Sequence, residues 1–326
     1  MSPLRSIPVP GPGRVTLALL FVVPAAMAYP WRSERAYWLL GAAAVAVILL
    51  FGWWGGLHFT TILRRRLAIM SRRNLYVPGS VPATKATALL RVGPPADESQ
   101  VLPLPLIARH LDCYGIRADA IRITSRSSAA RVQETWIGLT VSATDNLAAL
   151  RARSAQIPLS ETTGVAVRRL ADRLREIGWD ATMVGPDDVP RLLPANARET
   201  WRGLQRGASD YVAVYRVCVD ESLPETLDAV LSHPVRETCT ALEIAGDRTG
   251  RTFAAACAFL TESPPEAAAP VAGLTPQRGN HGPALAALDL LSTQRLDGHT
   301  AEPAGLLARL DWPTPGAGAH RAAIAH

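Results

Sequence analysis

Two apolar runs near the start of the chain organise the rest of it: Val15-Thr-Leu-Ala-Leu-Leu-Phe-Val-Val-Pro-Ala-Ala-Met-Ala28 and Gly41-Ala-Ala-Ala-Val-Ala-Val-Ile-Leu-Leu-Phe51. The second run lies within a stretch of no formal charge, residues 36–59. A helix needs about 20 apolar residues to cross the hydrocarbon core of a bilayer. We therefore predict a two-helix transmembrane hairpin over residues 15–59, with spans of about 15–31 and 36–59. An N-terminal cytoplasmic segment, residues 1–14, precedes it.

Aromatic and basic residues flank the second span. Trp53 and Trp54 lie near its end, where interfacial aromatic residues are common. The arginines that follow are Arg64, Arg65, Arg66, Arg72 and Arg73. Because positive residues favour the cytoplasmic side and attract anionic lipid headgroups, this cluster predicts that the chain after residue 60 is cytoplasmic. The expected location is the cell inner membrane, with two spans, contact with membrane lipids and a large cytoplasmic domain.

The first run also fits a secretory signal peptide. Arg5 and Arg14 precede the apolar residues, and Ala26-Met27-Ala28 has the small-x-small pattern of a cleavage site. Cleavage there would start the mature chain at Tyr29, outside the membrane. The second span would still deliver the C-terminal part to the cytoplasm, so both interpretations give the large domain the same location.

Hydrophobic periodicity after residue 98 predicts a mixed α/β domain. Apolar and polar residues alternate, as in strands, over 118–126, 134–142, 179–184, 209–219, 237–245 and 252–260. Helical spacing predicts helices over 105–114, 146–154, 162–177, 187–193, 224–231 and 283–292. A helix closed by Gly178 and followed by a strand is typical of a sheet with helices packed on it. The expected fold class is therefore α+β or α/β, with a cytoplasmic mixed α/β domain over residues 99–303.

Segments rich in proline and glycine bound this domain on both sides. Pro78, Pro82, Pro94 and Pro95 mark residues 60–98 as a basic juxtamembrane helix followed by a linker. Residues 304–326 are rich in proline, glycine and alanine, and we expect them to form a flexible C-terminal tail.

The net charge of +6 could suggest a nucleic-acid partner, but the juxtamembrane arginines account for most of it. In the predicted helix, the basic stretch Arg168–Arg175 includes an acidic residue and no interleaved aromatic residues, so no nucleic acid is expected. The four cysteines form no C-x-x-C pair and are interpreted as small hydrophobic residues rather than zinc ligands or disulfides: Cys113, Cys218, Cys239 and Cys257.

Three motifs invite a chemical interpretation, and each has a simpler structural one. Gly246-Asp-Arg-Thr-Gly250 lacks the spacing and the lysine of a phosphate loop, and it lies between two predicted strands, as a hairpin turn does. Asp187 and Asp188 could bind a metal–nucleotide, but their position favours the start of a helix. His110 has no fixed catalytic partner in the sequence. No catalytic, cofactor-binding or metal-binding residue is therefore predicted.

Several segments together resemble the EccE family, membrane components of the ESX (type VII) secretion systems of mycobacteria and related bacteria. The likeness covers nearly the whole chain and is greatest to the EccE of the ESX system linked to iron and zinc acquisition. None of its segments is a catalytic motif. The segments are FGWWGGLHFTTILRRRL (Phe51–Leu67), VLPLPLIARHLDCYGIRADAIRITSR (Val101–Arg126), ETWIGLT (Glu134–Thr140), AVRRLADRLREIGW (Ala166–Trp179), ETWRGL (Glu199–Leu204) and GLTPQRGN (Gly273–Asn280).

The resemblance implies a non-enzymatic structural subunit. It implies assembly with EccB, the ATPase EccC and EccD in an inner-membrane core complex that exports small helical proteins. No cofactor is implied. The alternative from another class is a membrane-anchored enzyme that depends on a nucleotide or a nucleotide sugar, with Asp187 and Asp188 binding the metal. A basic nucleic-acid-binding protein is a third, weaker alternative.

Overall fold

The computed structural model describes residues 12–27, 29, 34–51, 53–54, 57–71, 84–97, 100–128, 133–154, 157–190, 197–207, 209–246, 250–303 and 305–313. Its internal contacts divide the chain into two units, Met1–Leu75 and Tyr76–His326. Each unit is described by itself below.

The first unit contains two paired helices, α1 (Pro12–Met27) and α2 (Glu34–Phe51). A two-residue strand pair follows, β1 (Trp53–Trp54) with β2 (Leu57–His58), and then helix α3 (Phe59–Ser71). The predicted second span reaches residue 59, whereas α2 ends at Phe51, ahead of the strand pair. Among the described helices, none combines the length and the hydropathy needed to cross a membrane. The helical hairpin is therefore observed, and its passage through a bilayer stays a prediction.

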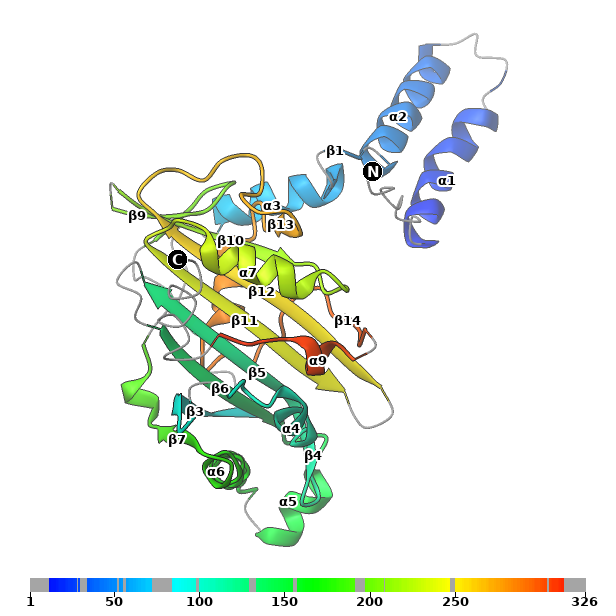
Figure 1. The fold of residues 1–326 in the computed structure, drawn as a ribbon. Coiled ribbons are helices and arrows are strands. Elements are labelled where there is room, and N and C mark those ends of the chain that lie inside the picture. Colours follow the sequence, from blue (N-terminus) through cyan, green and yellow to red (C-terminus); the bar gives the residue numbers. More distant parts are fainter. Residues whose placement is uncertain are drawn as a thin grey trace. The chain divides into compact units, whose positions relative to one another are not determined.

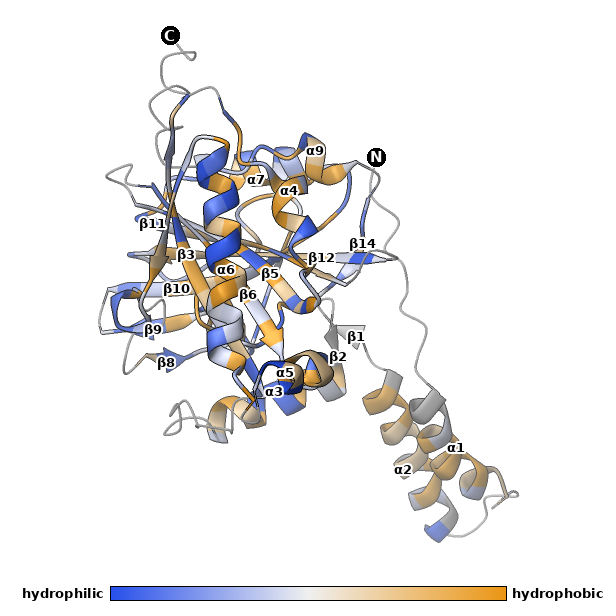
Figure 2. Ribbon diagram, turned by 90° about the horizontal axis from the view of Figure 1, so that it is seen from below, coloured by the Kyte–Doolittle hydropathy of each residue, from blue (hydrophilic) through white to orange (hydrophobic). Residues whose placement is uncertain are grey.

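Small residues lie where α1 and α2 are buried. Ala18 and Ala25 of α1 and Ala43 of α2 are at most 7 % exposed, as expected where two helix backbones approach closely. The large apolar side chains instead point outward, and both helices are mostly hydrophobic along their length (Figure 2). The exposed large side chains are Leu17, Leu19, Leu20, Phe21, Val22, Val23, Met27, Tyr37, Trp38, Leu39, Leu40, Val45, Ile48 and Leu49.

The second unit is built on a 12-stranded sheet in which every described pairing is antiparallel (Figure 1). The main strand order is β7-β3-β6-β5-β11-β12-β10-β9-β8, with β4, β13 and β14 paired to β5, β10 and β12. The strands are β3 (Lys85–Pro95), β4 (Asp112–Cys113), β5 (Ile116–Ser128), β6 (Gln133–Ser142), β7 (Trp179–Val184), β8 (Arg198–Glu199), β9 (Leu204–Arg206), β10 (Asp210–Val217), β11 (Glu237–Gly246), β12 (Arg251–Thr261), β13 (Leu274–Pro276) and β14 (Thr300–Ala301).

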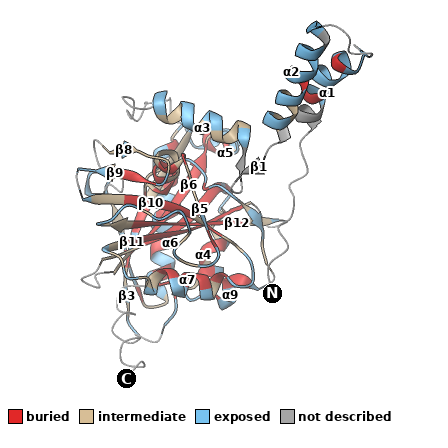
Figure 3. Ribbon diagram, turned by 90° about the horizontal axis from the view of Figure 1, so that it is seen from above, coloured by how far each residue is buried: buried red, intermediate tan, exposed pale blue. Residues whose placement is uncertain are grey.

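Helices cover both faces of this sheet. They are α4 (Leu104–Arg109), α5 (Leu147–Arg153), α6 (Leu159–Glu176), α7 (Leu223–Ser232), α8 (His281–Leu288) and α9 (Leu306–Arg309). The larger core cluster joins Ile121, Ile123 and other strand residues to side chains of α4, α6, α7 and α9. A second cluster joins Ala254, Ala256 and neighbouring small residues to α8 on the other face. The central strands are buried almost throughout (Figure 3).

The sequence predicted most of this sheet correctly. The predicted pairs 118–126 with 134–142, and 237–245 with 252–260, are the antiparallel hairpins β5–β6 and β11–β12. The helix predicted over 162–177 is α6, which Gly178 ends with a φ of +91°. Arg168 and Arg169 lie on the exposed side of α6, and Val167 and Leu170 are buried. The prediction of a mixed α/β domain with helices packed on a sheet is therefore confirmed.

Several expectations for the second unit differ from the structure. The helix predicted over 283–292 is α8, which ends at Leu288. Lys85–Pro95, assigned to a linker, is the inner strand β3, because Leu90 and Val92 enter the core. The segment after residue 304, expected to be a flexible tail, contains α9, and Leu306 and Trp312 are buried in the same core. The helix predicted over 105–114 stops at Arg109, since Asp112–Cys113 pairs with β5 instead.

Candidate functional site

Helix α3 carries the described part of the predicted headgroup site. Arg64 and Arg66 are exposed on it, and Arg65 is half-buried. Arg72 and Arg73 lie outside the described residues, and Trp53 and Trp54 form β1 with side chains that are not described. Four exposed apolar residues recur on α3 at helical spacing: Phe59, Leu63, Leu67 and Met70. The helix is therefore amphipathic, with exposed apolar and cationic groups side by side.

Asp187 and Asp188 lie in a three-residue 3₁₀ turn, Pro186–Asp188, and both are exposed. The helix predicted over 187–193 runs partly outside the described residues, since 191–196 are not described. Within the described part of the chain, no three His, Cys, Asp or Glu side chains converge to form a metal-binding group.

The segment from Gly246 to Gly250 connects the paired strands β11 and β12, as the hairpin interpretation predicts. Gly246 pairs with Arg251 across the hairpin and has a φ of +105°, a conformation that glycine adopts readily. All four cysteines are free. Cys239 and Cys257 are buried, which raises the pKa of the Cys239 thiol to about 12, whereas Cys113 and Cys218 are only half-buried.

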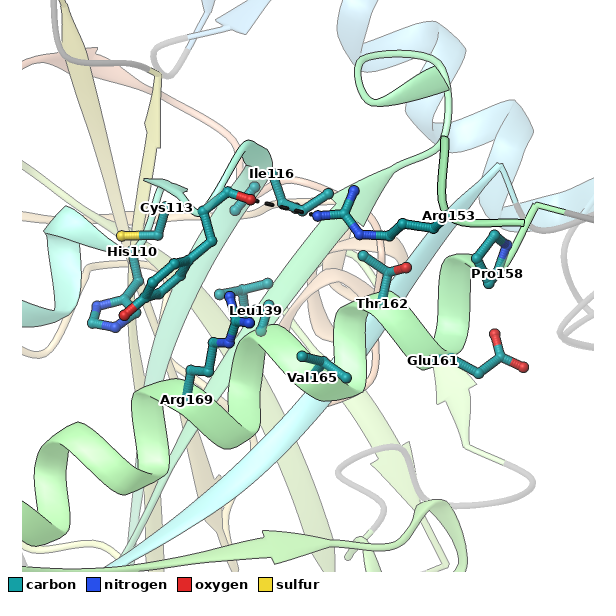
Figure 4. A pocket seen from close by; sticks show the side chains of 13 residues that line it. His110, Cys113, Ile116, Leu139, Arg153, Pro158, Glu161, Thr162, Val165 and Arg169 are labelled. Atoms are coloured by element: carbon teal, nitrogen blue, oxygen red, sulfur yellow. Dashed lines mark hydrogen bonds between the residues drawn. The ribbon is translucent and has the colours of Figure 1, made fainter. Parts of the chain in front are cut away.

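His110 and Cys113 line one of several cavities in the described structure. It has a volume of about 250 Å³ and lies among β4, β5, α5 and the first half of α6 (Figure 4). We call it the Tyr114 pocket, since Tyr114 forms part of its rim. Its floor contains Ile116 and Leu139, which are at most 7 % exposed.

A tight two-residue turn presents Tyr114 at the rim. Cys113 pairs with Ile116, so Tyr114 and Gly115 form the loop of the β4–β5 hairpin. Both have positive φ values, +56° and +71°, as a type I′ turn requires. Such a conformation costs a residue with a Cβ about 1–2 kcal/mol relative to glycine. Tyr114 nevertheless adopts it and leaves its side chain 68 % exposed.

Two arginines hold the Tyr114 turn from the helices. The guanidinium carbon of Arg169 lies 4.1 Å from the centroid of the Tyr114 ring, a cation–π arrangement. Arg153 donates from Nη1 to the carbonyl oxygen of Ala149 at 2.8 Å and from Nη2 to that of Tyr114 at 3.5 Å. Neither arginine forms an ion pair with another described residue.

His110 and Cys113 have backbone partners rather than catalytic ones. His110 donates from Nδ1 to the carbonyl oxygen of Leu106 at 3.2 Å, and the Cys113 thiol donates to the carbonyl oxygen of Arg109 at 3.2 Å. Burial lowers the pKa of His110, and the charge of Arg173 acts in the same direction. His110 is therefore neutral at pH 7, and the cationic character of the pocket comes from its arginines.

Comparison with known proteins gives the chain its family. A family model described as "type VII ESX secretion system translocon, EccE" matches residues 129–217. Two strains of Mycobacterium tuberculosis each have an "ESX-3 secretion system protein EccE3" that is 60 % identical over 327 aligned positions, covering 99 % of this chain and 98 % of each relative. The protein of that name in Mycolicibacterium smegmatis is 48 % identical over 296 positions, covering 91 % and 93 %. This chain belongs to the EccE family.

The EccE family match agrees with the resemblance found in the sequence. The matched residues 129–217 include β6, α5, α6 and β10, so the helical wall of the Tyr114 pocket lies within the part that the family model describes. The turn that carries Tyr114 lies just ahead of it.

A buried ionic network of this EccE chain was not predicted from the sequence. Arg122 of β5 and Glu243 of β11 are cross-strand partners, and Arg122 donates to Glu243 Oε2 from Nε at 2.9 Å and from Nη2 at 2.5 Å. Glu243 Oε1 accepts from His299 Nε2 at 2.9 Å and from the Leu296 amide at 3.2 Å. The available signal was a charged residue inside each predicted strand, Arg122 within 118–126 and Glu243 within 237–245.

Proposed function

We propose that this chain is the EccE component of an ESX-3 type VII secretion system and serves there as a structural subunit. The observation that carries the proposal is the 60 % identity to ESX-3 EccE3 proteins, which extends over 99 % of this chain and 98 % of the relatives. At that identity and coverage, both the paired N-terminal helices and the sheet domain are shared rather than a single module. The system linked to iron and zinc acquisition, named by the resemblance, is ESX-3.

The N-terminal unit would attach the subunit to the inner membrane. In α1 and α2 the small residues face each other and the large apolar residues face outward, which suits helices surrounded by lipid. Helices of 16 and 18 residues span about 24 and 27 Å at 1.5 Å per residue, less than the hydrocarbon core of about 30 Å, so flanking residues would have to complete each span. We propose that they insert as the two-span hairpin. Arg64, Arg65, Arg66, Arg72 and Arg73 would then lie at the cytoplasmic headgroups.

Helix α3 supports attachment at the cytoplasmic surface. Its exposed apolar residues would enter the acyl boundary, and Arg64 and Arg66 would meet anionic headgroups. The domain that follows would then remain close to the membrane, in the cytoplasm.

The sheet domain would act by docking to other subunits. The resemblance names EccB, the ATPase EccC and EccD as partners in a core complex that exports small helical proteins. Under this proposal the chain performs no chemistry itself and is needed for assembly of the complex.

The test is export by a strain whose only copy of the gene lacks residues 15–59. The proposal predicts that the truncated protein leaves the membrane fraction and that export of ESX-3 substrates stops, while the full-length gene restores both. Unchanged export by the truncated strain would contradict it.

The alternative of a membrane-anchored nucleotide-dependent enzyme has its own test. Asp187 and Asp188 are exposed on a single turn, and no third ligand joins them among the described residues. The purified chain would be heated with nucleotides, nucleotide sugars and Mg²⁺, with Asp187→Asn as the matched control. A rise in the unfolding temperature that the variant abolishes would favour the enzyme.

A further inference from the structure

We propose that the Tyr114 pocket docks an acidic segment of another subunit, which inserts one apolar side chain and presents a carboxylate to Arg153 and Arg169. The inference rests on the proposed function only in taking the partner from the same secretion complex. It adds the surface used for docking and the chemistry of the segment that fits it.

The shape of the pocket suits one large apolar side chain. The volume of about 250 Å³ exceeds that of a leucine or phenylalanine side chain but is small for a longer ligand. The floor is apolar, since Ile116 and Leu139 are nearly inaccessible to water. Val165 of α6 lines the opening and is 42 % exposed, so an incoming apolar group would cover it. Burial of apolar surface would stabilise the complex.

The positive charges at the rim favour an acidic residue next to the inserted apolar side chain of the docked segment. Arg153 and Arg169 extend toward the opening from α5 and α6 (Figure 4). Both are already oriented, by carbonyl oxygens in one case and by the Tyr114 ring in the other. A carboxylate would therefore find donors that have lost part of their side-chain entropy before binding. Arginine and carboxylate groups match in geometry as well as in charge.

The strained turn is an independent observation that points to the same site. Tyr114 holds a left-handed backbone conformation and gains no burial from it, because its side chain remains 68 % exposed. Strained residues of this kind concentrate at binding sites. Tyrosine and arginine are also the side chains that most often dominate the energy of protein interfaces. The Tyr114–Arg169 pair would thus form one wall of the binding site, against which the bound segment packs.

A lipid headgroup fits this site less well than a polypeptide does. The pocket has a volume of about 250 Å³, which is small for a lipid. An apolar floor that admits a single side chain also excludes an acyl chain with its glycerol group. We therefore assign the site to a protein segment with aspartate or glutamate next to a large apolar residue.

Photocrosslinking in the intact complex tests the inference. A benzophenone amino acid replaces Glu161 in the tagged full-length chain, expressed in its native host, and the cross-linked peptide is identified by mass spectrometry after purification. The matched control places the same group at Glu176, which is exposed at the other end of α6, about 22 Å away. We expect position 161 to capture a peptide of a co-purifying subunit that has an acidic residue beside an apolar one.

Charge reversal gives the decisive comparison. Arg169→Glu should lower the cross-linking yield about tenfold, because it replaces an attractive charge by a repulsive one. Arg168→Glu makes the same change on the neighbouring exposed residue, which does not line the pocket, and should leave the yield unchanged. Replacing the captured acidic residue by arginine should restore the yield with Arg169→Glu.

Several outcomes would overturn the inference. They are capture of lipid alone, capture of a peptide without acidic residues, an equal effect of the two charge reversals, or no cross-link at position 161. If the other subunits co-purify while one of these occurs, the docking site is wrong and the proposed function stands. If no subunit co-purifies with the unmodified chain, the proposed function itself fails.

Discussion

Arg122 and Glu243 face each other across β5 and β11 and form a buried ion pair, with 2.5 Å between Nη2 and Oε2. Arg122 is 7 % exposed and Glu243 is fully buried. Arg122 also donates to the carbonyl oxygens of Ala287 and Gln294, at 2.6 and 2.5 Å. The pair therefore joins two central strands to α8 and to the segment that follows it.

Removing one charge of this pair should destabilise the domain strongly. Arg122→Met leaves the Glu243 carboxylate buried without its cation, a change that costs about 3–5 kcal/mol. For a domain of this size, that loss lowers the unfolding temperature by about 6 °C or more. The full chain in detergent would be melted while its tryptophan fluorescence is recorded. An unchanged unfolding temperature would show that the pair contributes nothing.

The double variant Arg122→Met with Glu243→Leu distinguishes the contribution of the ion pair from that of the other contacts of the two residues. Because both charges are then absent, the loss should be smaller than for Arg122→Met alone. Equal or greater loss in the double variant would mean that the contacts of Glu243 with His299 and Leu296 matter more than the ion pair.

Acid should weaken the domain through two buried carboxylates. Burial alone would raise the pKa of Glu243, but the His299 hydrogen bond and the Arg122 charge hold it below its ordinary value. The same holds for Asp119. Burial raises its pKa, but the hydrogen bonds and charges of Arg295 and Lys85 lower it by more, so the pKa of Asp119 is also below its ordinary value. Each group is then more acidic in the folded than in the unfolded chain. The stability that it contributes is present above the unfolded pKa, about 4, and is lost as the pH falls through the folded pKa.

The measurement is the free energy of unfolding between pH 7 and pH 3. It should fall below about pH 4, and Asp119→Asn should reduce the slope there. A variant with the wild-type slope would contradict the assigned pKa direction of Asp119.

Trp312 should contribute to stability although it lies in the expected tail. It is 3 % exposed, and its Nε1 donates to Ser125 Oγ at 2.8 Å. Trp312→Ala should lower the free energy of unfolding by about 3–5 kcal/mol, as for other buried aromatic residues. Trp312→Phe keeps most of the apolar area and loses the hydrogen bond, so its effect should be about 1 kcal/mol.

Helix α3 should bind anionic membranes by itself. A peptide of residues 59–71 should become helical with vesicles that contain anionic lipid, and less so with neutral ones, as followed by circular dichroism. Replacing Arg64 and Arg66 by alanine should weaken the partitioning by about 1 kcal/mol each, or about fivefold per arginine. Equal binding to neutral and anionic vesicles would show that the arginines do not contribute to membrane attachment.

Local patterns were sufficient to predict the central sheet. Ile121 and Ile123 alternate with Arg122 and Thr124 in β5. In β6, Ile137, Leu139 and Val141 recur at every second position and enter the same core. β3 has the same pattern, with Leu90 and Val92 directed into the core. It was assigned to a linker because Gly93, Pro94 and Pro95 end it. The structure accommodates them with a shift in the pairing between Val92 and Pro95.

Features that depend on distant residues could not be predicted. Arg122 and Glu243 are 121 positions apart, and nothing local shows that their strands pair in that register. Trp312 meets Ser125 across 187 positions, so its burial was invisible within a segment rich in proline and glycine. The Tyr114–Gly115 turn lacks the Asn-Gly or Asp-Gly signal of a type I′ hairpin. Because it follows a stretch with helical spacing, Gly115 resembled the residue that ends a helix.

The central claim is membership of a secretion complex, and purification from the native membrane tests it most directly. The full-length chain would be extracted from the membrane in mild detergent and then purified by a C-terminal affinity tag. The chain lacking residues 15–59 serves as the control. The account predicts that the full chain recovers the ATPase subunit and a multi-span subunit at a fixed ratio across detergents, and that the truncated chain does not. Recovery of the full chain alone, in every detergent, would contradict it.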